Sequence, residues 1–237
     1  MDPSVKLVKD DGYSKKVDPI QYQSMVGSLL HAAKATRPDI AHAVGKVSKF
    51  CAAPTQAHLT AVKRIFRYIK GTIDLKLQYK PVNEKLLGYS DADWANDLND
   101  RHSTTGNVFT MSGGAVSWLS QKQAKVALST AEAEYIALGS ATQEAIWLKQ
   151  LLADLNTAPK KIEILEDNQS AIAMANNSAG HKRTKHIDIK HHFIREAVQT
   201  GTITLSYCPI ANMLADVFTK QLPKTQFVNL RRRLGLN

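Results

Sequence analysis

Near its middle the chain carries the run Leu86-Leu87-Gly88-Tyr89-Ser90-Asp91-Ala92-Asp93-Trp94. Apolar residues alternate along this run as in a strand, and the run ends in two carboxylates, which predicts a central strand with Asp91 at its carboxyl end. A buried, isolated carboxylate costs several kcal/mol, so an acid in this position is normally paired or bound to a metal. An Asp turn that closes an ordinary hairpin is the alternative interpretation of this stretch.

The composition is that of a globular protein. With 237 residues, 43% of them hydrophobic, the chain can bury one sizeable core, or one core and a smaller appendage. No apolar run approaches the roughly 18 residues that a membrane span needs, so we expect a soluble protein. Cys51 and Cys208 lie far apart and lack the spacing of a zinc site or a disulfide framework, which predicts buried thiols in a reducing compartment.

Positive charge is concentrated in the first third of the chain. Residues 1–81 carry 14 Lys and Arg against 6 Asp and Glu, whereas residues 82–237 carry 17 against 15. A basic module beside a nearly neutral one with clustered acids indicates a surface that binds a polyanion next to an acidic centre. A merely solvated Lys-rich surface is the alternative.

The sequence pattern divides the chain into four parts. Apolar residues recur at helical spacing over 19–35, 40–50 and 55–70, with Asp18-Pro19, Pro38 and Gly71 as start and stop signals. We therefore predict a flexible lead-in (1–18), a basic helical segment (19–82), an α/β domain (83–222) and a basic C-terminal tail (223–237).

The α/β domain begins with an antiparallel meander and continues with strand-to-helix units. Its predicted elements are strands at 86–94, 106–111, 115–120, 162–167 and 202–208, a long helix after Ser129 or Thr130 with a possible break at Gly139, and a last helix over 212–220. A strand at 162–167 that leads into a helix implies a parallel neighbour in the same sheet.

Four acids stand where they can meet. Asp91 and Asp167 follow strands, Asp216 lies on the closing helix, and Glu134 lies on the long helix. Clustered carboxylates stay ionised together only when cations neutralise them, and a site made of oxygen ligands suits Mg²⁺ or Mn²⁺. Two such ions can activate water and stabilise the leaving oxygen of a phosphodiester, which indicates a metal-dependent nuclease.

Five motifs carry a resemblance to a known family. They are Ser90-Asp91-Ala92-Asp93-Trp94-Ala95, Ser129-Thr130-Ala131-Glu132-Ala133-Glu134-Tyr135-Ile136-Ala137, Glu166-Asp167-Asn168-Gln169-Ser170-Ala171, Lys185-His186-Ile187-Asp188 and Ala215-Asp216-Val217-Phe218-Thr219-Lys220. Residues 85–222 resemble the ribonuclease H domain of copia-type LTR retrotransposon Pol polyproteins. The helices before it resemble the segment that joins the reverse transcriptase to that domain, and no Tyr-x-Asp-Asp polymerase motif occurs in the chain.

The resemblance implies a fold, a reaction and a set of ligands. The fold is a ribonuclease H-like mixed five-stranded α/β sheet flanked by helices and preceded by a small helical segment. The reaction is hydrolysis of the RNA strand of RNA/DNA hybrids during reverse transcription, with two Mg²⁺ ions, or Mn²⁺, held by Asp91, Glu134, Asp167 and Asp216. Glu132 is the rival for the helix position, but it lies about 200° round the helix from Glu134. We interpret Asp93 as a turn residue.

Substrate contacts are expected in two stretches that follow the second acidic strand end. Asn168 and Gln169 follow Asp167 at a helix start, where they contact the hybrid or cap the helix. A basic stretch further on provides phosphate contacts, or is a solvated face; its candidate residues are Lys182, Arg183, Lys185 and His186. The stretch from Cys208 to Asp216 contains no histidine, although many cellular ribonucleases H carry one there.

Other functions remain compatible with the residues. The main alternative is a catalytically inactive nucleic-acid-binding or structural remnant of a retrotransposon polyprotein; an integrase-like or exonuclease member of the superfold fits the order of the acids less well. The implied partners are an RNA/DNA hybrid and the missing polymerase region, without a membrane or a small-molecule cofactor. The implied location is the cytoplasmic retrotransposon particle, with the nucleus as the alternative.

Overall fold

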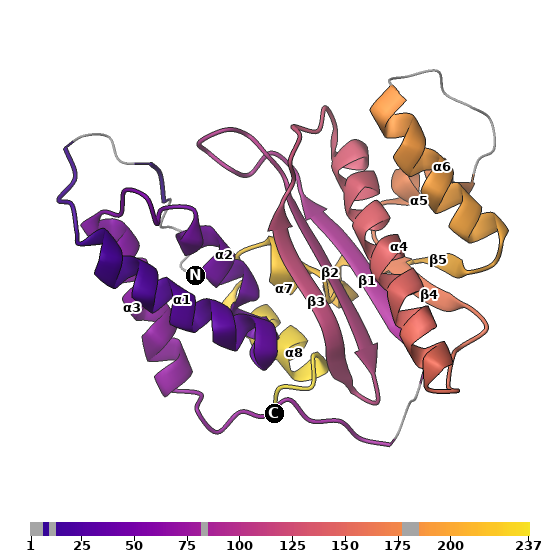
Figure 1. Ribbon diagram of the computed structural model, residues 1–237, viewed down its shortest axis with the longest axis horizontal. Helices are drawn as coiled ribbons and strands as arrows, with labels where there is room; N and C mark the ends of the chain where they lie inside the picture. Colours follow the sequence, from indigo (N-terminus) through magenta and orange to yellow (C-terminus); the bar gives the residue numbers. More distant parts are fainter. Residues whose placement is uncertain (1–6, 10–12, 82–84, 177–184) are drawn as a thin grey trace.

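A mixed five-stranded sheet forms the centre of the molecule (Figure 1). The computed structural model describes residues 7–9, 13–81, 85–176 and 185–237, except the side chains of 185–191. The strands run in the order β3-β2-β1-β4-β5, which confirms the predicted sheet. Their bounds are β1 (Leu87–Asp93), β2 (Thr104–Met111), β3 (Gly114–Lys122), β4 (Ile162–Glu166) and β5 (Ile203–Tyr207).

Strand pairing brings the two predicted acidic strand ends side by side. β1 pairs antiparallel with β2, and β2 with β3, as the meander required. β1 pairs parallel with β4, and β4 with β5. In parallel strands the carboxyl ends meet at one edge of the sheet, so Asp91 of β1 and the end of β4 at Glu166 come together.

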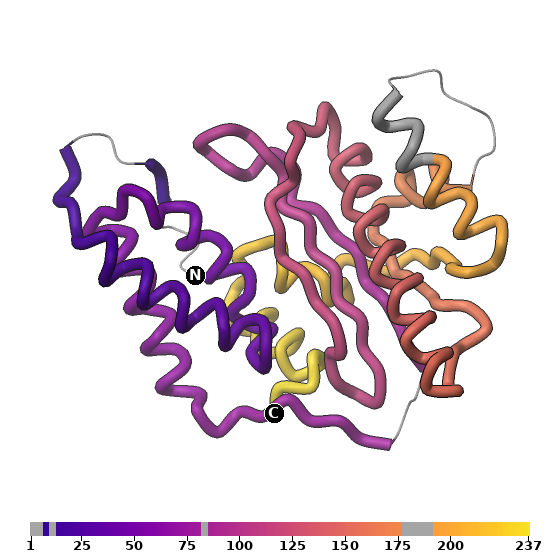
Figure 2. The backbone as a smooth tube through the Cα atoms, in the orientation of Figure 1, coloured from indigo at the N-terminus to yellow at the C-terminus, as the bar shows by residue number. Residues whose placement is uncertain are grey.

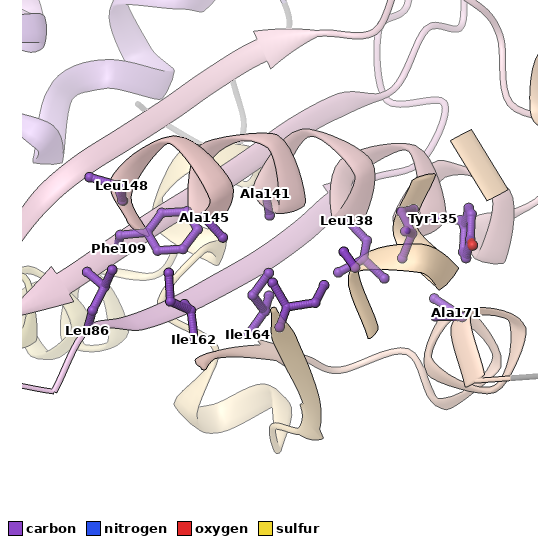
Figure 3. Close-up of a cluster of buried hydrophobic side chains, with 14 residues drawn as sticks. Leu86, Phe109, Tyr135, Leu138, Ala141, Ala145, Leu148, Ile162, Ile164 and Ala171 are labelled. Atoms are coloured by element: carbon purple, nitrogen blue, oxygen red, sulfur yellow. The ribbon is translucent and has the colours of Figure 1, made fainter. Parts of the chain in front are cut away.

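One face of the sheet is covered by α4 (Thr130–Asp154), with α5 (Gln169–Asn176) and α6 (Lys185–Gln199) beside it (Figure 1). Between α4 and the sheet lies an apolar core that includes Phe109, Leu138 and Ile164 (Figure 3). The predicted break at Gly139 is wrong, because α4 continues through this residue. Gly139 is buried, and the packing of its neighbours Leu138 and Ala141 in the core under α4 outweighs the weak helix propensity of glycine.

The opposite face carries a 3₁₀ turn (Ile210–Asn212), α7 (Asp216–Thr219) and α8 (Lys224–Arg233). The single helix expected over 212–220 is therefore wrong in extent, because the extended backbone at Met213 separates the turn from α7. α7 approaches β2 closely at Gly106, where a Cβ atom would lie 2.6 Å from the Thr219 methyl carbon. Glycine at this position lets α7 reach the sheet beside Asp91, the partner of Gly106 across the ladder.

The predicted helices of the N-terminal segment are confirmed as α1 (Pro19–Ala35), α2 (Ala41–Ser48) and α3 (Gln56–Lys70), with a 3₁₀ turn (Pro38–Ile40) before α2. The Asp18 side chain caps α1 by accepting a hydrogen bond from the Ile20 amide at 2.9 Å. The three helices bury their own apolar core around Tyr22 and Val44. Within the described ranges, no helix is both long and apolar enough to cross a membrane.

The helical segment is joined to the rest of the molecule by side-chain hydrogen bonds and by backbone pairing between the segment after α3 and the last residues of the chain. The Trp118 indole donates to the Ala33 carbonyl at 2.8 Å, and Arg231 of α8 donates to the Tyr68 hydroxyl at 3.1 Å. The segment after α3 runs beside the C-terminus (Figure 2), where the Lys76 amide donates to the Asn237 carbonyl at 3.0 Å. Part of the expected C-terminal tail is thus the helix α8, followed by residues that pair with the linker.

Candidate metal centre

Three of the predicted acids converge on the α7 side of the sheet edge. Asp91 of β1 and Asp216 of α7 are almost fully buried, and Asp167 directly follows β4. One carboxylate oxygen from each of the three lies within 4.8 Å of the others. Asp91 shares its face of β1 with Tyr89, which belongs to the core under α7 and α8, so strand alternation directs it towards Asp216.

A second group of acids lies on the α4 side of the same edge. Glu134 of α4, Glu166 at the end of β4 and Asp167 also place one oxygen each within 4.8 Å of one another. Glu166 is fully buried and Glu134 is 6% exposed. Asp167 belongs to both groups, so five carboxylates form one cluster that spans the edge of the sheet.

The two groups differ in their partners. Asp91 accepts hydrogen bonds from the Thr219 hydroxyl and, at 2.9 Å, from the Lys220 ammonium. Lys220 also binds Asp216 at 2.8 Å. Glu134 Oε2 and Glu166 Oε2 are buried and have no hydrogen-bond partner among the described residues. The α7 side is thus partly neutralised, and the α4 side is not.

The pKa values follow this distribution of charge. Burial raises the pKa of Asp216 to about 6, and the charge of Asp91 adds to the shift. Burial also raises the pKa values of Glu134 and Glu166 well above the usual range, with neighbouring carboxylates as a further cause. Burial opposes the charge of Lys220, but Asp91 and Asp216 outweigh it and raise the pKa of the ammonium. The cluster is therefore short of positive charge.

The oxygen donors and the two orphaned carboxylate oxygens fit a divalent cation. Buried charged groups without a partner are rare unless an ion completes the site. Carboxylate oxygens are ligands that Mg²⁺ and Mn²⁺ accept, and the set contains no sulfur or imidazole donor. Asp91, Asp167 and Asp216 would hold one ion, and Glu134, Glu166 and Asp167 a second.

The rivals for the ligand positions lie elsewhere. Glu132 caps α4: its carboxylate accepts from the Leu128 amide at 2.7 Å, and its own amide donates to Ser129 at 3.2 Å. Asp93 accepts from the Asn96 side chain and belongs to neither group of converging acids. The structure thus brings Glu134, and not Glu132, into the cluster.

The predicted substrate contacts are only partly visible. The Asn168 side chain accepts from the Ala171 amide at 3.0 Å, which is a helix cap, while Gln169 is exposed. Lys182 and Arg183 lie outside the described residues, as do the side chains of Lys185 and His186 at the start of α6. The capping role of Asn168 is therefore present, and the phosphate-contact role of the basic stretch stays a prediction.

Sequence reasoning missed three residues of the site: Glu166, Thr219 and Lys220. Glu166 has the same strand parity as Ile162 and Ile164, which face α4, so alternation would have indicated that it points towards Glu134. Lys220 follows Asp216 by four residues, a spacing that favours ion pairs on helices. No comparable signal identifies Thr219, whose contact to Asp91 depends on the close approach of α7.

Comparisons with known proteins place the chain in a family. It is 44% identical over 230 residues to the retrovirus-related Pol polyprotein from transposon TNT 1-94 of Nicotiana tabacum, covering 97% of this chain and 17% of that protein. It is 40% identical over 238 residues to the corresponding polyprotein from transposon RE1 of Arabidopsis thaliana, covering 100% of this chain and 16% of that protein. The chain thus spans about a sixth of the length of these curated relatives. No protein-family model matches it.

Two solved structures are similar to the chain, and the first of them shows the fold. A foamy viral protease-reverse transcriptase in complex with double-stranded DNA matches 93% of this chain and 34% of its own, with a TM-score of 0.53 and 12% identity. A ribonuclease H1 isolated from compost matches 57% of this chain and 93% of its own, with a TM-score of 0.43 and 19% identity. From its relatives and its sheet, the chain belongs to the copia-type retrotransposon Pol polyproteins and forms a ribonuclease H-like part of one, preceded by three helices.

Proposed function

We propose that this chain is a metal-dependent endoribonuclease that cleaves the RNA strand of RNA/DNA hybrids during reverse transcription of a retrotransposon. The observation that carries the proposal is the convergence of five carboxylates at the ends of β1 and β4, two of which have a buried oxygen with no partner in the described part of the chain. A site of this composition is costly unless it binds cations, and cations in such a site serve phosphodiester hydrolysis.

In this proposal the acids act together as ligands, and the fold positions three of them in different ways. The five carboxylates would hold divalent ions, and bound ions would supply an activated water and charge stabilisation for the leaving oxygen of the phosphodiester. Asp91 is held in place by the Thr219 hydroxyl, so its orientation is fixed before substrate binds. Glu134 projects from a long, rigid helix onto the same edge, and Asp167 joins the two groups.

The basic helical segment supports the binding of a polyanion beside this cluster. Four cations of α3 are exposed to solvent: Lys63, Arg64, Arg67 and Lys70. A cavity of about 510 Å³ is lined by both Arg64 and Lys220, so the basic helix and the acid cluster lie on adjoining surfaces. We propose that these cations bind phosphates of the hybrid and that the acids act on its RNA strand.

A cleavage assay tests the proposal. The full chain is incubated with end-labelled RNA/DNA hybrid, double-stranded RNA and double-stranded DNA of one sequence, each with Mg²⁺, with Mn²⁺ and with EDTA. We expect products from the hybrid only, and only with metal. Asp167→Asn serves as the inactive control against contaminating nuclease, and Asp74→Asn, at an exposed acid remote from the cluster, as the matched active control.

A salt series on the same samples separates the proposal from its alternative. An inactive nucleic-acid-binding remnant would bind the hybrid with an affinity that falls steeply with salt, yet yield no product with either metal. That outcome, with a folded and metal-saturated protein, would replace the endoribonuclease by a binding module. Cleavage of all three duplexes alike would contradict hybrid specificity.

A further inference from the structure

Lys220 joins two of the three acids that form the α7 side of the cluster. Its ammonium lies 2.9 Å from Asp91 Oδ1 and 2.8 Å from Asp216 Oδ1. Both carboxylates are buried, whereas the Lys220 side chain keeps 32% of its surface exposed. The positive head thus reaches between two buried acids while part of the side chain stays in contact with solvent.

The main chain of Lys220 is held in place, so only the side chain is free to move. Its amide donates to the Asp216 carbonyl at 3.0 Å. The buried His42 of α2 lines the same cavity as this residue. A lysine side chain has a flexible stem of four carbons. The Lys220 ammonium can therefore leave the cluster by rotation of this stem, without disturbing α7.

Lys220 neutralises only one side of the cluster. Both oxygens of Asp91 have a partner, the Thr219 hydroxyl and the ammonium. On the α4 side, Glu134 and Glu166 have a buried oxygen without a partner, and no described cation lies in hydrogen-bond contact with either carboxylate. A divalent ion can meet the α4 side without competition, but at Asp91 and Asp216 it meets a positive charge already in place.

We propose that Lys220 is a resident counter-cation that competes with a divalent ion for Asp91 and Asp216. Its ammonium holds the two carboxylates together in the metal-free protein and has to leave them when an ion binds there, because like charges cannot share the same oxygens at contact distance. Lys220 therefore weakens metal binding on the α7 side and makes the two sides of the cluster unequal. The inference rests on the proposed function in so far as the cluster binds divalent ions.

The test removes the positive charge of Lys220 and keeps a side chain of similar length. In the full chain, Lys220→Met should lower the melting temperature in EDTA, since two buried carboxylates lose their cation. The same variant should bind Mg²⁺ about tenfold more tightly at its weaker site, measured by calorimetric titration and by the rise in melting temperature with Mg²⁺ concentration. Lys220→Arg, which keeps the charge, should resemble the wild type in both measurements.

Lys85→Met is the matched control. Lys85 also pairs with a carboxylate, Glu163 at 2.6 Å, but on the exposed start of the sheet and away from the cluster. Its loss should leave Mg²⁺ affinity unchanged. A general effect of net charge on cation binding would appear in both variants, whereas competition at Asp91 and Asp216 appears in Lys220→Met alone.

Each outcome decides the proposal. A Lys220→Met protein that folds only with Mg²⁺ supports it, because the ion then replaces the lost lysine. Unchanged or weaker Mg²⁺ affinity of the variant overturns it. A variant that is unfolded both with and without Mg²⁺ also overturns it, as does the finding that neither the wild type nor the variant binds Mg²⁺. Hybrid cleavage by the wild type is scored separately: tighter binding in the variant without any cleavage by the wild type would remove the proposed function and leave this inference standing.

Discussion

Asp39 and Asp91 are two buried aspartates in surroundings of very different charge. Asp39, in the turn before α2, accepts two hydrogen bonds from the Arg37 guanidinium, at 2.9 and 2.8 Å, and one from the Tyr68 hydroxyl at 2.6 Å. One acid thus faces one base in a forked geometry, and every hydrogen bond favours the folded chain. This pair closes the helical segment and needs no ligand.

Asp91 also has one cation and one hydroxyl as partners, Lys220 and Thr219. Its other neighbours are acids, so among the residues that the structure describes a single ammonium stands against five carboxylates. The difference teaches that burial and pairing alone do not reveal a functional acid. The balance of charge around it does, since a deficit of cations persists only where something outside the chain can supply them.

The largest expected effect is on cleavage by Asp91→Asn. The substitution keeps the volume and removes a ligand charge, so cleavage of the hybrid should fall by on the order of a thousandfold or more. The melting temperature should change little, because the loss of the Lys220 ion pair is offset by relief of repulsion among the acids. Single-turnover rates and thermal melts measure the two quantities; a variant that cleaves as fast as the wild type would exclude Asp91 from the site.

Asp39→Asn should have the opposite pair of effects, a loss of stability without a loss of cleavage. Removing this charge leaves the Arg37 guanidinium buried without its carboxylate, which costs about 3 kcal/mol of unfolding free energy. Cleavage per folded molecule should match the wild type. Urea unfolding followed by circular dichroism gives the stability. A loss under about 1 kcal/mol would mean that the pair behaves like a surface ion pair and that the contrast with Asp91 is overstated.

A smaller effect is expected from His42, a buried residue of α2 that lines the same cavity as Asp39 and Lys220. Burial, and then the charge of Lys46, lower its pKa from 6.5 to about 3. The folded state therefore resists protonation that the unfolded state accepts: the stability is present above pH 6.5 and is lost as the pH falls towards 3. Each pH unit in that window should cost up to about 1.4 kcal/mol.

The measurement compares the wild type with His42→Gln, which keeps a polar side chain of similar size but does not titrate. Unfolding free energies from pH 7.5 to 5 should fall more steeply for the wild type, and the difference between the two slopes isolates His42 from other groups. Parallel curves would show that the ring is protonated in the folded state without penalty.

The smallest effects separate Asn168 from Gln169 beside the acid cluster. Asn168→Ala should lower stability by about 1 kcal/mol, because it removes the cap of α5. Gln169→Ala should leave stability and metal affinity unchanged and reduce hybrid cleavage severalfold, since this exposed amide is free to contact the substrate. If Gln169→Ala cleaves at the wild-type rate, the polar pair serves the helix alone.

Local sequence patterns predicted the fold well because most helices and strands of this chain are defined by signals only a few residues apart. Helical spacing and the caps at Asp18 and Thr55 located α1 and α3, and strand alternation located the sheet. The failures are tertiary in origin. Gly139 stays helical because the helix around it is packed in the core, and the helix over 212–220 is divided because α7 has to approach β2 at Gly106.

The acids of the site were predictable because they follow strands or lie on the helices beside those strands. The sequence identified Asp91, Glu134, Asp167 and Asp216 as candidates, and the structure brings them to one edge. It did not indicate which residues neutralise or orient them, because those contacts join positions far apart in the chain. Thr219 reaches Asp91 across most of the domain, a relation that no local spacing encodes.

The pairing of residues 76–78 with 235–237 has a consequence for how the chain folds. The Lys76 and Asn237 backbones exchange two hydrogen bonds, so the end of the helical segment is tied to the last residues of the chain. Contacts between such distant positions close a very large loop and form slowly, whereas the three N-terminal helices rest on local contacts. We expect helices α1–α3 to form early and to dock onto the sheet late. The pairing of residues 76–78 with 235–237 should form after the sheet and α8 are in place.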